Sequence, residues 1–234
     1  MKNTEGKLKA GKALSTMAVG VSSPPPSVRP TTAFSLFQSS LKRARNLLAI
    51  HKLAHGAQAR PPVFLADAHR AAIVLAVSAL DAYVRTLVID KIVAKVGNPS
   101  EVVPDKLREH IQECLGQDSI LEAARQGDLL SRVEKAFRDK FNDQSFQGVR
   151  KITAAMKLIG IDDVFATIAK AASVNEANLK NDVGKVTKRR HIIVHCGDYD
   201  LSQAPPVENR ILKKDVTSCI KTVELVAREI NKLW

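Results

Sequence analysis

The sequence predicts an all-α protein, a single helical bundle preceded by a flexible tail. Apolar residues recur at helical period through most of the chain, and no part of it shows the strand–helix alternation of an α/β fold. Hydrophobic residues make up 45% of the chain but aromatic residues only 4%. The core must therefore consist of Leu, Ile, Val and Ala, which suit packed helices. A length of 234 residues fits one domain with a substantial core.

The first 32 residues differ from the rest of the chain. They contain Lys, Gly and Ser and the run Pro24-Pro25-Pro26, without a sustained apolar period. Such a segment buries too little surface to offset the entropy lost on ordering. We therefore predict a flexible basic tail over residues 1–32 and one helical domain over residues 33–234.

Two features bear on the compartment. A secretory signal is the alternative to a tail, but Ser15, Thr16 and Gly20 make the stretch after the first lysines too weakly apolar for one. The three cysteines are widely spaced and form no CxxC pair. Unpatterned cysteines fit reduced thiols better than a disulfide framework, so we expect a cytoplasmic protein.

The helices in the first half have clear signals at their ends. Thr31-Thr32 are good N-cap residues for a first helix that should end at His55-Gly56. A second helix should run from about Asp67 to Val96. It is apolar on more than one face from Ala71 to Leu80, which places it at the centre of the bundle. This apolar stretch is shorter than the roughly 20 residues that span a membrane, so we expect a core helix and no membrane contact.

The second half predicts shorter helices, then two longer ones. Glycines divide the segment from Pro104 to Ser173 into several short helices. The next helix should span about Asn175 to His195, with Arg190 on its inward-facing side. A final helix should begin near Asp215, after a loop.

The chain is strongly basic. It has 36 Lys and Arg against 24 Asp and Glu, a formal net charge of +12. A surplus of this size attracts polyanions such as RNA, DNA or anionic lipid. A solvated basic surface is the alternative, because charge alone names no partner.

The segment from Lys188 to Asp200 is the densest cluster of reactive side chains. Arg190 and His195 are five residues apart, which is about 140° around an ideal helix. They converge on one cleft if His195 lies in a fraying last turn. His191 and His195, at i and i+4, should lie on nearly the same face.

At this point the sequence resembles the HEPN family. Arg190-His191-x-x-x-His195 is similar to its Arg-x4-6-His signature, and the longer string to the RiboL-PSP-HEPN branch, where Arg-Asn-x-Ile-Val-His is typical. Three other segments are also similar to helices of the family: Phe34–Leu48 to its entry helix, Ala71–Val88 to its early long helix and Leu212–Leu233 to its last helix. The resemblance therefore covers about residues 33–234. His191 departs from the usual Asn or Asp. Some HEPN toxins have a Tyr that is modified two residues after the motif His, but here that position is Gly197.

The resemblance implies RNA cleavage that needs neither metal nor cofactor. The ribose 2′-OH would attack the adjacent phosphorus, His195 would take or give the proton, and Arg190 would stabilise the developing negative charge. From the residues themselves we expect supporting roles for His191, Asp81 and Asp198, with Asp81, a carboxylate on the central helix, orienting Arg190. Lys188 and Arg189 would contact the RNA phosphates. The family further implies a homodimer with a composite cleft, an antitoxin or sensor partner, and a place in a toxin or antiviral defence system.

Other interpretations remain open from the residues alone. The chain could be a non-catalytic HEPN-like module that binds RNA or a protein. Arg190 could be a structural partner of Asp81, Asp198 or Asp200, and His195 could only cap its helix. Lys188 and Arg189 could form a solvated basic turn. A metal site would need two imidazoles and a carboxylate, His191 and His195 with Asp198 or Asp200, but no Glu general base accompanies them.

Overall fold

The computed structural model describes residues 32–55 and 64–234. Within these residues, nine helices and one two-stranded antiparallel sheet follow the order α1 (Thr32–His55), α2 (Phe64–Gly97), α3 (Asp105–Leu115), α4 (Gln117–Gln126), α5 (Leu129–Asn142), α6 (Val149–Leu158), α7 (Val164–Ala172), α8 (Glu176–Cys196), β1 (Tyr199–Asp200), β2 (Val207–Glu208) and α9 (Lys213–Asn231). The all-α prediction is confirmed. The predicted tail lies outside the described residues, except for Thr32, the first residue of α1.

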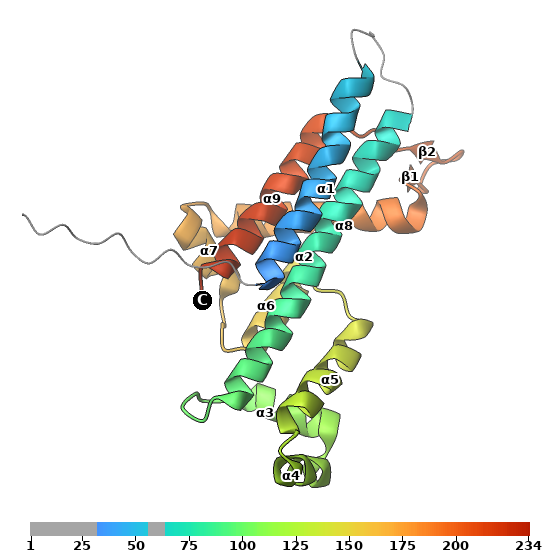
Figure 1. The fold of residues 1–234 in the computed structure, drawn as a ribbon. Coiled ribbons are helices and arrows are strands. Elements are labelled where there is room, and N and C mark those ends of the chain that lie inside the picture. Colours follow the sequence, from blue (N-terminus) through green and yellow to red (C-terminus); the bar gives the residue numbers. More distant parts are fainter. Residues whose placement is uncertain (1–31, 56–63) are drawn as a thin grey trace, which may run out of the picture.

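The helices α1, α2 and α9 form the long central bundle (Figure 1). Near the start of α1, Phe34 and Phe37 pack on Tyr83 of α2, with ring centroids 5.8 and 5.6 Å from it. All three side chains are buried. Burying one such aromatic side chain contributes roughly 1.5–3 kcal/mol, so this cluster is a main reason why α1 docks on α2.

The central position predicted for the second helix is confirmed. Along α2, buried residues occur on several faces, because the helix packs against α1, α5, α6, α8 and α9. The helix begins at Phe64, three residues before the predicted start. By length and composition alone, residues Leu65–Gly97 could cross a membrane. The shorter stretch from Ala71 to Leu80, considered in the sequence, was too short to do so. The most apolar window of Leu65–Gly97 is, however, 61% buried in the bundle, as expected for a core helix.

The short helices pack around the C-terminal half of α2. Figure 1 shows α3, α4 and α5 gathered at that end of the bundle. Phe137 and Phe141 of α5 meet edge to face, and Phe146 in the next loop packs on Phe141 in the same way. The edge-to-face geometry suits the quadrupoles of the rings and fixes the loop before α6.

Helix α8 carries the basic and histidine residues singled out in the sequence. Its first turn is capped by Asn175, whose side chain accepts the Asn178 N–H at 3.0 Å. The helix ends where expected, because Gly197 adopts a left-handed conformation with φ 58°. Figure 1 shows that α8 leads into the β1–β2 hairpin beside the beginning of α2. The helical pattern did not predict this hairpin.

Candidate active site

Two histidines stack on the exposed side of the last turns of α8. The rings of His191 and His195 have centroids 4.4 Å apart, with their planes tilted by 39°. Both residues are exposed. The prediction that they share a face is therefore confirmed, and both imidazoles are open to a ligand from solution.

Arg190 lies on the inward-facing side of the same helix, in line with Leu179 and Val183, which are buried. The side chain is half-buried, and its Nε is enclosed without a hydrogen-bond partner. Among the described residues, no carboxylate forms an ion pair with Arg190. The guanidinium charge is therefore not neutralised by this part of the protein.

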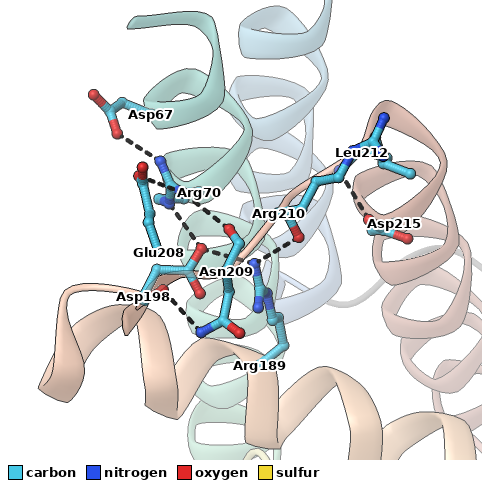
Figure 2. A network of polar contacts seen from close by, with 9 residues as sticks. All are labelled: Asp67, Arg70, Arg189, Asp198, Glu208, Asn209, Arg210, Leu212 and Asp215. Carbon is cyan, nitrogen blue, oxygen red and sulfur yellow. Dashed lines mark hydrogen bonds and ion pairs between the residues drawn. The ribbon is translucent and has the colours of Figure 1, made fainter. Parts of the chain in front are cut away.

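Asp198 follows the glycine that ends α8, and its side chain is fully buried. One of its oxygens, Oδ2, accepts hydrogen bonds from Arg70 Nε at 2.8 Å and from Arg189 Nη2 at 2.7 Å (Figure 2). Its φ of 67° is left-handed, a conformation that Asp adopts more readily than most residues. The left-handed turn at residues 197 and 198 therefore directs this carboxylate back between two arginines.

The predicted role of Arg189 needs correction. It was expected either to contact RNA phosphates or to belong to a solvated basic turn, and Asp198 was one of three possible structural partners of Arg190. Instead, Arg189 is half-buried, and its Nη2 also donates to the carbonyl oxygen of Arg210. The reason is the helical spacing: Arg189 and Arg190 differ by about 100° in direction, and Arg189 faces the returning chain.

Arg70 is the residue that the sequence interpretation missed. It is 8% exposed and contacts three further groups, namely Asp67 at 3.0 Å, Glu208 at 2.7 Å and the carbonyl of Asn209 at 3.2 Å. Burial alone would lower the pKa of Arg70, but the hydrogen bonds to Asp198 and Asp67 outweigh it and raise the pKa. The available signal was an arginine immediately before the most apolar stretch of the chain, where a buried cation needs a partner.

This network joins three elements. Arg70 belongs to α2 and Arg189 to α8, while Asn209 follows β2 and donates from both its backbone N and its Nδ2 to the Asp198 carbonyl at 2.8 Å (Figure 2). Removing one partner of a buried, paired charge typically costs about 3–5 kcal/mol. The network therefore holds the last turn of α8, and with it His195, against α2.

Asp81 does not orient Arg190 as expected. Its Oδ2 pairs with Arg85 Nη2 at 3.2 Å, and its Oδ1 accepts the backbone N–H of Phe146. Arg85 also donates to the Gln144 carbonyl at 2.8 Å. Because Arg85 is one turn further along the same helix, Asp81 is satisfied locally. Its role is to anchor the loop before α6.

The alternative metal site is not assembled from the residues proposed for it. Asp198 is committed to two arginines. Asp200 accepts hydrogen bonds from Ser202 and Gln203, which lower the pKa of its carboxyl. Within residues 32–55 and 64–234, no group of three or more His, Cys, Asp or Glu side chains is placed to hold a metal ion.

A family model described as RiboL-PSP-HEPN matches residues 39–233. The matched range contains the whole of α2 to α9, and therefore both the stacked histidines and the Asp198 network. No curated protein and no solved structure matches the chain.

Proposed function

Because the chain belongs to the RiboL-PSP-HEPN family, we propose that it is an endoribonuclease that cleaves RNA without a metal ion. HEPN domains generally bind RNA and often dimerise. One observation carries the step from family to activity. Asp198 binds Arg70 and Arg189, whereas Arg190 has no carboxylate partner among the described residues. Arg190 therefore keeps its charge for a phosphate, one residue before the exposed histidine pair.

In the proposed reaction the substrate supplies its own nucleophile. The ribose 2′-OH attacks the adjacent phosphorus, the bond to the 5′-oxygen breaks, and the products carry a 2′,3′-cyclic phosphate and a 5′-OH. His195 removes the proton from the 2′-OH, since a neutral imidazole has a ring nitrogen that accepts a proton. The leaving 5′-oxygen receives a proton in turn, and His191, whose ring centroid lies 4.4 Å from that of His195, supplies it.

Arg190 would stabilise the negative charge that develops on the phosphorane oxygens. A guanidinium is always charged and presents several donors in one plane, which suits two phosphate oxygens at once. Groups placed in advance where charge develops act strongly in a site that excludes water. The enclosed Nε of Arg190 lies in such surroundings.

The directions of Arg190 and His195 favour a composite site. On an ideal helix they point about 140° apart, so one protomer presents them to different sides of α8. We propose that a second copy, apposed at the end of α8, completes the cleft with its own pair. A toxin or defence system with an antitoxin or sensor partner is the biological setting that we propose for this homodimer.

The experiment uses labelled RNA in excess EDTA. The wild type should cleave, and His195→Ala and Arg190→Ala should each lose at least a hundredfold in rate. Lys106→Ala, an exposed substitution on α3, is the matched control and should cleave as the wild type does. Loss of wild-type cleavage in EDTA, or full activity in both site variants, would exclude the proposal.

A binding module without catalysis is the second candidate. It is favoured by apolar side chains on the hairpin beside the histidines, since Tyr199, Leu201 and Val207 are 44%, 64% and 48% exposed. Exposed apolar side chains gathered in one place often mark a docking surface. Under this interpretation the protein binds RNA or a protein through the same end of α8, but no RNA is cut in any buffer.

A further inference from the structure

The loop between α5 and α6 lies against the C-terminal half of α8. The hydroxyl of Thr187 is 2.9 Å from the carbonyl oxygen of Gln147 and donates to it. The next loop residue is a glycine, and a Cβ on Gly148 would lie 3.7 Å from Thr187 Cγ2. Thr187 precedes Arg190 by three residues, so their Cβ atoms are neighbours on the helix surface, about 5–6 Å apart. The loop therefore passes within reach of the Arg190 side chain.

The backbone of this loop, residues 143–148, is held from two helices. The N–H of Phe146 donates to Asp81 Oδ1 on α2, and the Phe146 side chain is buried. The carbonyl of Gln144 accepts a second hydrogen bond from α2, at 2.8 Å. The contact from α8 to the Gln147 carbonyl adds a third. A loop fixed in this way presents the Gln147 side chain to α8 in a defined position.

The side-chain amide of Gln147 has one end in use and one end free. Its Nε2 donates to Ser145 Oγ at 2.8 Å. Its Oε1 is enclosed and accepts no hydrogen bond from the described residues. Enclosed acceptors without a donor are costly, and native proteins keep few of them. Because Oε1 is closed to solvent, its donor has to come from a neighbouring side chain.

Arg190 has the complementary deficit. Its Nε is enclosed and donates to no acceptor in the described part of the chain, whereas its two Nη nitrogens are not among the enclosed atoms. The guanidinium therefore has an inner N–H without a partner and an outer pair of nitrogens that a phosphate can meet. Gln147 Oε1 is an acceptor of the kind that the inner N–H lacks.

The alternative acceptor beside α8 is Asp198 Oδ1, which is enclosed without a donor as well. The other oxygen of this carboxylate is held by Arg189, whose direction on α8 differs by about 100° from that of Arg190. Thr187, which contacts the loop, differs from Arg190 by only about 60°, in the opposite sense. Arg190 therefore turns toward Gln147 and away from Asp198.

We propose that Gln147 is a positioning residue for Arg190, whose Nε–H it accepts through Oε1 when RNA is bound. With Nε held from behind, the two Nη nitrogens face the phosphate oxygens together, the geometry in which a guanidinium binds them best. This inference rests on the proposed nuclease function, in which Arg190 stabilises the developing charge. It adds the residue that fixes the direction of that charge.

The first test is single-turnover cleavage by Gln147→Met, which removes the acceptor and keeps the length of the side chain. The maximal rate should fall at least tenfold, because a misdirected guanidinium stabilises the transition state poorly. The RNA concentration that gives half of this rate should change less than twofold, because the cation still attracts the phosphate. The matched control is Gln144→Met in the same loop, where the backbone carbonyl makes the contact to α2. It should cleave within twofold of the wild type, and equal rates in the two variants would overturn the proposal.

A double-mutant cycle with Arg190→Lys separates positioning from support of the fold. Lysine keeps the positive charge but has no Nε–H within its stem. Gln147→Met should therefore slow cleavage less than twofold in Arg190→Lys protein, against at least tenfold in the wild type. A tenfold loss in both backgrounds would mean that Gln147 only supports the loop, and the proposal would be wrong.

An NMR measurement on isotope-labelled arginine needs no cleavage. The resonance of the Arg190 Nε–H is identified by its loss in Arg190→Lys, and 2′-O-methyl oligo(U) is then added as an RNA without a free 2′-OH. Exchange of this proton with water should slow at least tenfold in the wild type but less than twofold in Gln147→Met. No slowing in the wild type, or equal slowing in both proteins, would refute the contact.

The two kinds of readout distinguish failure of the contact from failure of the nuclease. If bound RNA slows the exchange through Gln147 but the wild type cuts no RNA, the proposed reaction fails and the contact stands. If the wild type cuts RNA and Gln147→Met cuts it equally fast, the positioning role fails and the reaction stands.

Discussion

Arg189 donates to the buried carboxylate of Asp198 across 2.7 Å. This contact separates the roles of two adjacent arginines, because Arg190, the next residue, has no such partner among the described residues. The first arginine fixes the end of α8, and the second keeps its charge. The sequence motif alone does not distinguish them.

The two arginines should therefore respond differently to truncation. Arg189→Ala should lower the free energy of unfolding by about 2 kcal/mol, since a charged hydrogen bond to a buried carboxylate is lost. Arg190→Ala should change it by less than about 1 kcal/mol but reduce RNA cleavage at least a hundredfold. Urea unfolding and single-turnover cleavage of both variants check this. If the two variants behave alike in both assays, the assignment of roles is wrong.

Asp198→Asn should be among the more destabilising conservative changes in the chain. Asn tolerates the left-handed backbone, so the loss reflects charge alone: two arginines remain with no carboxylate between them. We expect about 3 kcal/mol of destabilisation, seen as a lower urea midpoint. Asp182→Asn is the control, because it removes a surface carboxylate with one distant partner and should change stability by less than about 0.5 kcal/mol. Equal midpoints for the two variants would contradict the network.

The three cysteines should report RNA binding by their reactivity. Burial raises the pKa of Cys219 to about 12, so this thiol should resist iodoacetamide at pH 8 in the folded protein. Cys114 and Cys196 are half-buried and should react. Oligo(U) added to His195→Ala protein should slow labelling of Cys196, beside the motif, but not of Cys114 on α3. Peptide mass spectrometry reads each site, and equal protection of Cys114 and Cys196 would count against binding at the end of α8.

Glu229 should make the free energy of unfolding decrease as the solution becomes acidic. Burial alone would raise the pKa of Glu229, but hydrogen bonds from Lys232 and Arg228, each at 2.9 Å, outweigh it and lower the pKa below the ordinary 4.5. A lowered folded-state pKa adds stability above pH 4.5, and this stability is lost as the pH falls through the folded value. Glu229→Gln should therefore flatten the decline in unfolding free energy below pH 4.5. A decline as steep as that of the wild type would contradict this account.

The sequence predicted those features that depend on local signals. The end of α8 followed from Gly197, because a left-handed conformation after a helix is a property of neighbouring residues. The stacking of His191 on His195 followed from their spacing. The pairing of Asp81 with Arg85 has the same i to i+4 spacing and was equally readable.

The features that were missed depend on contacts far along the chain. Arg70 and Asp198 are 128 residues apart, and no periodicity links them. The hairpin has strands of two residues each, too short to show an alternating pattern.

The central claim is that the end of α8 activates the 2′-OH of the RNA itself. Single-turnover cleavage of an RNA carrying one 2′-deoxy nucleotide at its mapped cut site, in excess EDTA, tests it most directly. The account predicts that cleavage at that site is abolished, while the all-ribose RNA yields a 2′,3′-cyclic phosphate. Cleavage of the deoxy-substituted RNA at an unchanged rate would contradict it.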